Sequence, residues 1–205
     1  MSLKYWRWQC ASVILILYLV NMQNKALKTL FVFNGLFLFA GSLLGPLYAI
    51  FVEKITRGIF PITLSWSMFL ISTTIFTILV AKIGDRIKEK EYLLMLGYVI
   101  RAVVWFSYIF IQDFYILLLA QFILGIGEAT GTPAFDAIFA EHLDKGKHIF
   151  EYSQWKVISN IVLAIGTVLG GLIAERFGFS PLFFFMSILA MVSCIGIWLK
   201  PRKLL

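Results

Sequence analysis

Charged residues, cysteines and histidines are all scarce in this 205-residue sequence. Charged residues make up 14% of it, whereas soluble domains average about 25%. The two cysteines, Cys10 and Cys194, lie far apart in apolar stretches, so no disulfide framework, thiol redox pair or zinc site is expected. The two histidines, His142 and His148, fall in one short loop, which leaves no intramembrane Ser–His pair for a protease. We therefore expect neither an enzyme nor a metal or other cofactor.

Hydrophobic residues, by contrast, make up 60% of the sequence, and aromatic residues 17%. A soluble protein of this length could not bury so much apolar surface, because soluble domains are only about 45–50% apolar. The formal net charge of +7 could suggest nucleic-acid binding, but the basic residues are spread through short loops rather than gathered on one face. Contact with anionic lipid explains that distribution better. The composition predicts a partner in the lipid bilayer and none in nucleic acid.

Six stretches are long and apolar enough to cross a bilayer as helices, which takes about 20 residues each. They are expected at 30–52, 62–80, 92–111, 114–137, 157–174 and 181–199. The loops between them are short, so residues 30–200 are expected to form one all-α membrane domain, followed by a cytoplasmic tail at 201–205.

Residues 1–29 allow three interpretations. The apolar run at 11–20 is only half a span, and Trp6 and Trp8 precede it. An interfacial helix anchored by these tryptophans is the preferred interpretation. A signal-peptide core and a seventh span are the alternatives.

Lysine and arginine set the expected orientation, because they are enriched in cytoplasmic loops. With the N-terminus in the cytoplasm, 14 of the 18 basic residues lie in cytoplasmic segments, three (Lys54, Arg57 and Arg176) lie outside, and Arg101 lies within a span. This bias predicts a multi-pass protein of the cell membrane with both termini in the cytoplasm.

The first three predicted helices look like a copy of the last three. The sequence AIFVE at 49–53 matches AIFAE at 137–141, and IGDR at 83–86 matches IAER at 173–176, with offsets of 88 and 90 residues. Three helices separate the copies, so the second copy must be inverted in the membrane. Inverted repeats of this kind are typical of secondary transporters. Chance similarity between apolar helices that end in a charge is the alternative.

Two motifs resemble those of the major facilitator superfamily. The loop at 81–90 resembles the motif G-x-L-A-D-R-x-G-R-R/K, with Asp85, Arg86 and Lys90 in matching positions and departures at 81, 88 and 89. The stretch at 121–129 resembles R-x-x-x-G-x-G-x-A, with Gln121 in place of the arginine. The resemblance covers residues 24–199 and is closest to the N-terminal half of a twelve-span transporter, and to six-helix members of the superfamily.

The resemblance implies roles for several residues. In the family, the motif aspartate caps a facing helix within a charge network that acts as a gate. By this resemblance Asp85, Arg86, Lys90 and Glu141 form that gating motif. The proton-transfer role proposed for the family arginine is in doubt here, because Gln121 replaces it.

Charges inside spans need a reason, because each costs about 2.5–3.5 kcal/mol on insertion scales. Arg101 and Glu128 are predicted near the middle of adjacent antiparallel helices. We expect them to pair or to face a shared aqueous cavity, with Glu128 either a protonatable coupling group or one half of a structural pair. Asn34, Gln121 and Asp136 are further candidates for lining a cavity.

The sequence therefore predicts a half-size secondary active transporter of a small solute. Proton-coupled efflux of a drug or metabolite, with lipophilic cations as a conceivable substrate, is the expected activity. Because the family's pathway runs between two halves, a homodimer or a second half of the same superfamily is expected as partner. The alternative is a membrane scaffold or regulatory half without transport activity, or a truncated remnant.

Overall fold

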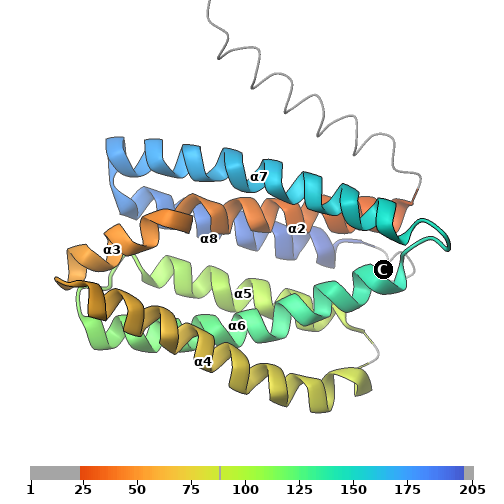
Figure 1. Cartoon of the computed structure of the whole chain (residues 1–205), viewed down its shortest axis with the longest axis horizontal. Helices are drawn as coiled ribbons and strands as arrows, with labels where there is room; N and C mark the ends of the chain where they lie inside the picture. Colours follow the sequence, from red (N-terminus) through yellow and green to blue (C-terminus); the bar gives the residue numbers. More distant parts are fainter. Residues whose placement is uncertain (1–23, 88, 201–205) are drawn as a thin grey trace, which may run out of the picture.

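The computed structural model describes residues 24–87 and 89–200, which fold into a bundle of helices (Figure 1). The first span consists of α2 (Lys25–Leu44), a 3-10 turn η1 (Gly45–Leu47) and α3 (Tyr48–Ile55). The remaining elements are α4 (Ile59–Ile83), η2 (Gly84–Arg86), α5 (Glu91–Ser107), α6 (Phe114–Glu141), α7 (His148–Phe177) and α8 (Phe179–Trp198). Helices suit this composition, because a bilayer offers no hydrogen-bond partners to the backbone.

Within these described residues, five helical stretches are long and apolar enough to cross a membrane: Lys25–Ile55, Ile59–Ile83, Phe114–Glu141, His148–Phe177 and Phe179–Trp198. The other long helix, α5, has 17 residues and is at the lower limit of spanning lengths. It packs against α6 and α8, while another face, which includes Leu96 and Val103, is exposed. The predicted all-α architecture of six helices is confirmed, with one helix shorter than expected.

Two helix starts differ from the hydropathy prediction. The first helix begins at Lys25, where the Asn24 side chain accepts hydrogen bonds from the backbone N–H groups of Ala26 and Leu27. The fifth begins at His148 rather than at 157, so Lys156 lies in the third turn of α7 and not in a loop. Residues 1–23 and 201–205, which hold most of the predicted interfacial segment and the tail, lie outside the described residues.

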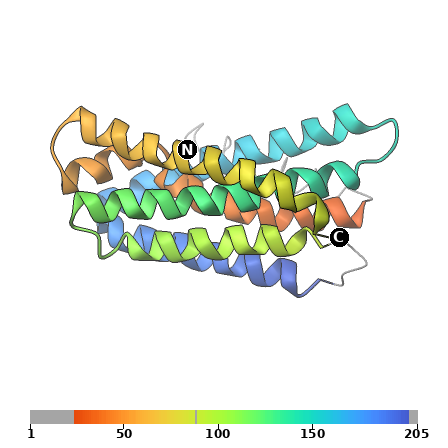
Figure 2. The same ribbon diagram turned by 90° about the horizontal axis from the view of Figure 1, so that it is seen from below.

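The helices pack in a pattern that the inverted repeat explains. The packing of α4 against α6 corresponds to that of α7 against α2. The packing of α5 against α6 corresponds to that of α8 against α2. The two remaining helices of this scheme, α5 and α8, pack against each other at the centre. Exchanging the first three spans with the last three leaves these five pairings unchanged, whereas the packing of α7 against α8 has no comparable counterpart between α4 and α5. Figures 1 and 2 show that α2 begins at the end of the bundle where α6 finishes, so the equivalent helices run in opposite directions.

The two copies differ at their prolines. Pro46 lies in η1, where the first span changes from α2 to α3. A proline lacks the N–H that would continue the helical ladder and crowds the preceding turn, which explains the break. Pro133 occupies the corresponding place in the second copy, yet α6 continues through it. The break therefore gives the first span two separate helical segments.

Glycines set the distance between helices at several contacts. At Gly97 of α5, an added Cβ would lie 2.6 Å from the Cα of Gly131 in α6. At Gly170 of α7, an added Cβ would lie 2.7 Å from the carbonyl carbon of Leu43 in α2. Small residues let backbones approach closely in a bilayer, where the hydrophobic effect gives little drive for helices to associate.

Gly170→Ala should lower the stability of the bundle, because the new methyl group would press against the backbone of Leu43. We expect a loss of about 1–3 kcal/mol from overpacking. The matched control is Gly171→Ala, where an added Cβ meets no atom within 4 Å and alanine improves helix propensity by about 1 kcal/mol. Thermal unfolding in detergent would compare the two variants, and equal melting temperatures would contradict the assignment of this contact.

Candidate functional site

A cavity of about 860 Å³ lies between α6 and α7, with further walls from α2 and α5. Its lining extends from Arg101 and Glu128 to His148 and Ile149, the first residues of α7. The cavity therefore reaches the end of the bundle where α6 finishes and α7 starts. Its volume is in the range of pockets that hold small ligands, about 300–1,000 Å³.

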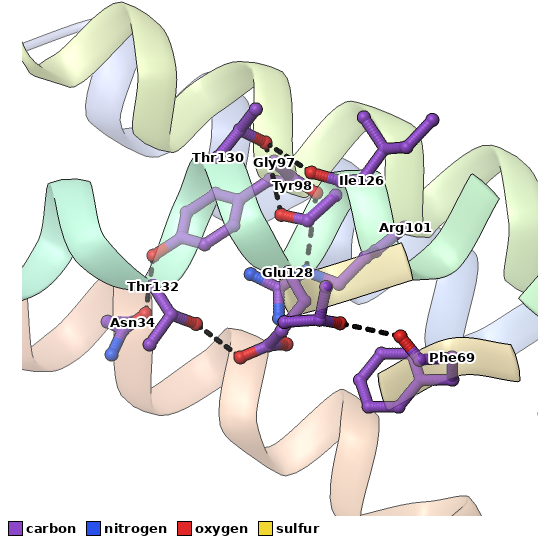
Figure 3. A network of polar contacts seen from close by, with 11 residues as sticks. Asn34, Phe69, Gly97, Tyr98, Arg101, Ile126, Glu128, Thr130 and Thr132 are labelled. Carbon is purple, nitrogen blue, oxygen red and sulfur yellow. Dashed lines mark hydrogen bonds and ion pairs between the residues drawn. The ribbon is translucent and has the colours of Figure 1, made fainter. Parts of the chain in front are cut away.

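The Arg101–Glu128 ion pair forms the inner wall of the cavity. Arg101 Nη1 of α5 donates to Glu128 Oε2 of α6 at 2.5 Å, and the hydroxyl of Thr132 donates to Glu128 Oε1 at 2.5 Å (Figure 3). The guanidinium also lies over the ring of Phe37, 4.3 Å from its centroid. The Arg101 side chain is 9% exposed and that of Glu128 29%, so the acid is the more accessible partner.

Glycines make room for the guanidinium. An added Cβ at Gly131 would lie 2.6 Å from Arg101 Nη2, and one at Gly127 would lie 2.9 Å from Arg101 Cγ. Arg101 Nε donates to the carbonyl oxygen of Gly97 at 3.3 Å, one turn earlier in α5. The glycines at 127 and 131 thus accommodate a charged side chain as well as a neighbouring backbone.

A second polar contact joins α5 to α2 beside the ion pair. The hydroxyl of Tyr98 donates to Asn34 Oδ1 at 2.7 Å, and both side chains are buried (Figure 3). Phe37 stacks on Tyr98 with ring centroids 4.3 Å apart. Asn34 also lines the cavity. This contact joins two helices of the first repeat at the depth of the cavity.

Aromatic side chains form the apolar wall between α6 and α7. Phe135 packs against Trp155 with ring centroids 5.0 Å apart, and Phe139 packs against Tyr152 at 4.7 Å. Phe31 of α2 closes the cluster at 4.9 Å from Trp155. The cavity therefore combines a polar inner end with an aromatic wall.

Asp136 lines the same cavity two turns beyond Glu128. Residues 128, 132 and 136 are four apart, so they share one face of α6 and form a polar stripe along the cavity. The Asp136 carboxylate has neither an ion pair nor a hydrogen bond within the described part of the chain.

Gln121 lies elsewhere, at the end of the bundle opposite the cavity mouth. It is 1% exposed, and its Nε2 donates to the hydroxyl groups of Tyr48 at 2.6 Å and Tyr108 at 3.1 Å. The Tyr48 hydroxyl donates in turn to Ser65 Oγ at 2.7 Å. No partner for Gln121 Oε1 occurs in the described ranges. The sequence does not predict the contacts of either tyrosine with Gln121. A tyrosine in an apolar stretch has the same sequence context whether its side chain faces lipid or protein.

The residues of the predicted gating motif lie near the end of the bundle where the cavity opens. Lys90, just before α5, forms an ion pair with Glu141 at the end of α6. Arg86 is exposed in η2, which also contains the backbone of Asp85. The side chain of Asp85 is outside the described set, so its predicted capping role stays a prediction.

Comparisons with known proteins identify the family. Residues 30–204 match the family model described as Major Facilitator Superfamily. The chain belongs to this superfamily. Its members are transporters rather than enzymes, so the predictions of a transporter family and of a non-enzymatic, multi-pass membrane protein are confirmed.

Two known proteins are similar to the chain. It is 27% identical over 158 residues to "Uncharacterized MFS-type transporter YitZ" of Bacillus subtilis (strain 168), an alignment that covers 76% of this chain and 94% of that protein. The crystal structure of the POT family transporter PepTSo is similar in fold, with a TM-score of 0.69 and 13% identity, over 87% of this chain and 37% of that one. This chain therefore spans well under half the length of that protein.

Arg101 and Glu128 should show strong energetic coupling in a double-mutant cycle. Glu128→Gln leaves the buried guanidinium without a counter-charge and should cost more stability than Arg101→Met, which leaves the more exposed acid. We expect a coupling energy of about 1–3 kcal/mol from unfolding in detergent, with the double variant more stable than additivity requires. Lys156→Met is the control, because Lys156 lines the cavity with no ion pair among the described residues. Strictly additive losses of stability would contradict an energetically coupled ion pair.

Restoring the family arginine at position 121 should destabilise the chain. The Gln121 side chain is surrounded by hydroxyl groups, and none of its hydrogen-bond partners in the described chain is a carboxylate. Gln121→Arg should therefore cost about 3–5 kcal/mol as an uncompensated buried charge. Gln121→Met, of similar size and without charge, should cost less than about 1.5 kcal/mol. Melting temperatures in detergent test this difference, and an unchanged value for Gln121→Arg would refute it.

Proposed function

We propose that this chain is a secondary active transporter of a small solute, that the cavity between α6 and α7 is its solute site, and that Glu128 couples solute movement to protons. The observation that carries the proposal is the Arg101–Glu128 pair on the cavity wall. A charge within a span is costly, so it is kept where it has a partner or a function. Here both residues line the cavity, and the acid is the more exposed of the two.

Coupling follows from the chemistry of the pair. The ionised carboxylate of Glu128 offsets the charge of Arg101 and accepts the hydroxyl of Thr132. Protonation removes the negative charge, so the contact between α5 and α6 weakens and Arg101 needs another partner. A solute and a proton can thus favour different packings of the two helices, and an inverted repeat supplies two related packings.

The gate in this proposal is the charged network at the cavity end. The Lys90–Glu141 ion pair joins the start of α5 to the end of α6 there. In the sequence, Asp85 and Arg86 lie between α4 and α5, in the same connection as Lys90. Such a network can open and close as the two helices shift, whereas the buried node around Gln121 holds the opposite end closed.

The proposed orientation puts the cavity mouth at the cytoplasm of the cell. The loop between α6 and α7 carries Lys145 and Lys147, in keeping with a cytoplasmic loop, while Arg176 at the far end of α7 is one of few basic residues there. Both termini are then cytoplasmic, and the conformation described is open inward.

Transport by this chain is proposed to require a second half, most simply another copy. The aligned YitZ protein is itself of similar length, since 158 residues cover 94% of it. A two-fold dimer would place two copies of the cavity face to face. Chemical crosslinking in native membranes tests this pairing, and a strictly monomeric chain that still transports would exclude it.

Glu128→Gln should abolish pH-gradient-driven solute movement in reconstituted vesicles, because the glutamine cannot bind or release a proton. The matched control is Glu175→Gln, an exposed acid at the far end of α7, which should transport at the wild-type rate. Dissipation of the pH gradient on addition of solute is the measurement. Transport by Glu128→Gln at the wild-type rate would remove Glu128 from the coupling step.

A further inference from the structure

The charges that line the cavity cancel. Arg101 and Lys156 contribute two positive charges, and Glu128 and Asp136 contribute two negative ones. Arg101 and Glu128 satisfy each other through their ion pair. Asp136 and Lys156 form no ion pair with each other or with any other residue that the structure describes. The cavity therefore offers one uncompensated carboxylate and one uncompensated ammonium group.

These two free charges lie at similar depth on helices that face each other across the cavity. Asp136 directly follows Phe135 in α6, and Lys156 directly follows Trp155 in α7. The rings of Phe135 and Trp155 are in contact, with centroids 5.0 Å apart, so Asp136 and Lys156 lie within about one helical turn of each other along the bundle axis. Both residues line the cavity. A ligand that enters between the helices thus meets a negative group on one side and a positive group on the other.

Both charges lie away from the helix ends and face a space that a ligand or water can fill. Lys156 is eight residues from the start of α7 and Asp136 five residues from the end of α6, about 12 Å and about 8 Å along the helices. A charge within a bundle of membrane-spanning helices needs water or an opposite charge beside it. The cavity supplies the space, and a solute of matching charge would supply the partners.

We infer that the cavity recognises a small zwitterion with an apolar or aromatic body, whose ammonium group pairs with Asp136 and whose carboxylate pairs with Lys156. The apolar body lies against the aromatic wall formed by Phe135, Phe139, Tyr152 and Trp155. An ion of one sign would gain one of these contacts and be repelled at the other. A volume of about 860 Å³ leaves room for a solute as large as a dipeptide. This inference rests on the proposed function in taking the cavity as the solute site.

Binding of a charge-matched series to the purified full chain tests the inference. The probes are the zwitterion phenylalanylphenylalanine, its C-terminal amide, which keeps only the positive charge, and its N-acetyl derivative, which keeps only the negative charge. Titration in detergent, followed by thermal shift, should give a dissociation constant for the zwitterion at least about tenfold lower than for either derivative, because each lost contact is a charge-assisted one. Equal affinities for the three probes would overturn the inference.

Charge-specific variants assign each contact. Asp136→Asn should weaken binding of the zwitterion and the amide but leave the N-acetyl derivative unchanged, while Lys156→Gln should weaken the zwitterion and the N-acetyl derivative but not the amide. The control is Lys147→Gln, a loop lysine outside the cavity lining whose partner is Asp144. It should bind all three probes like the wild type. Uniform losses across the probes in both cavity variants would refute the pairing.

A charge exchange keeps the test valid if a single variant folds poorly. The double variant Asp136→Lys with Lys156→Asp restores one charge of each sign and should bind the zwitterion again, whereas Asp136→Lys alone should not. If instead these variants change crosslinking between copies and leave probe affinities unaltered, the two charges belong to an interface, and the inference is wrong. Tighter binding of tetraphenylphosphonium than of the zwitterion would also overturn it.

Failure of this inference is distinguishable from failure of the proposed function. Affinity is measured without any transport, and the dependence of transport on Glu128 is measured without reference to the charge of the probe. The predicted charge pattern in binding with no uptake into vesicles would uphold the zwitterion site and reject transport. Glu128-dependent transport of a solute with no charge pattern among the probes would uphold transport and reject the zwitterion site.

Discussion

The close approach of α5 to α6 determines most of what surrounds the cavity. At Gly97 and Gly131 the two backbones come so near that a methyl group on the first would overlap the second. The same absence of side chains opens the space in which the guanidinium of Arg101 lies, within reach of Glu128 and over the ring of Phe37. A charge can remain inside a bilayer only with such compensation. The helix contact, the ion pair and the inner wall of the cavity are thus one arrangement.

Hydropathy is sufficient to find the six helices, because each must present about 20 apolar residues to lipid or to its neighbours. It fails at the start of α7, since Glu151 and Gln154 there are buried against protein and lower the local hydropathy without ending the helix. Lys156 consequently reads as a loop residue in the sequence, although it lies inside the helix. The rule that matches basic residues to cytoplasmic loops contributes to this error, because it treats a lysine as a marker of the membrane boundary.

The candidate site likewise contains one contact that the sequence predicts and others that it does not. That Arg101 should meet Glu128 follows from two opposite charges at similar depth in antiparallel helices. The surroundings of Gln121 do not follow from sequence, because contacts with Tyr48 and Tyr108 depend on how distant helices are rotated about their axes. The sequence does not reveal that rotation in a membrane bundle, because the lipid-facing and buried faces of a helix are both apolar. Polar residues inside spans are therefore located by sequence, but their partners are found only in the folded chain.

The glycines at 127 and 131 also bear on how this sequence can vary among its relatives. A side chain at either position would displace Arg101, and without Arg101 the carboxylate of Glu128 would lose its counter-charge. A relative that replaces Arg101 by a small residue loses the tightest contact at both glycine positions, keeps only those with Ile100 and Gly97, and has no need of an acid at 128. These four positions should therefore co-vary in evolution as a single unit, even though 101 and 131 are 30 residues apart in the sequence.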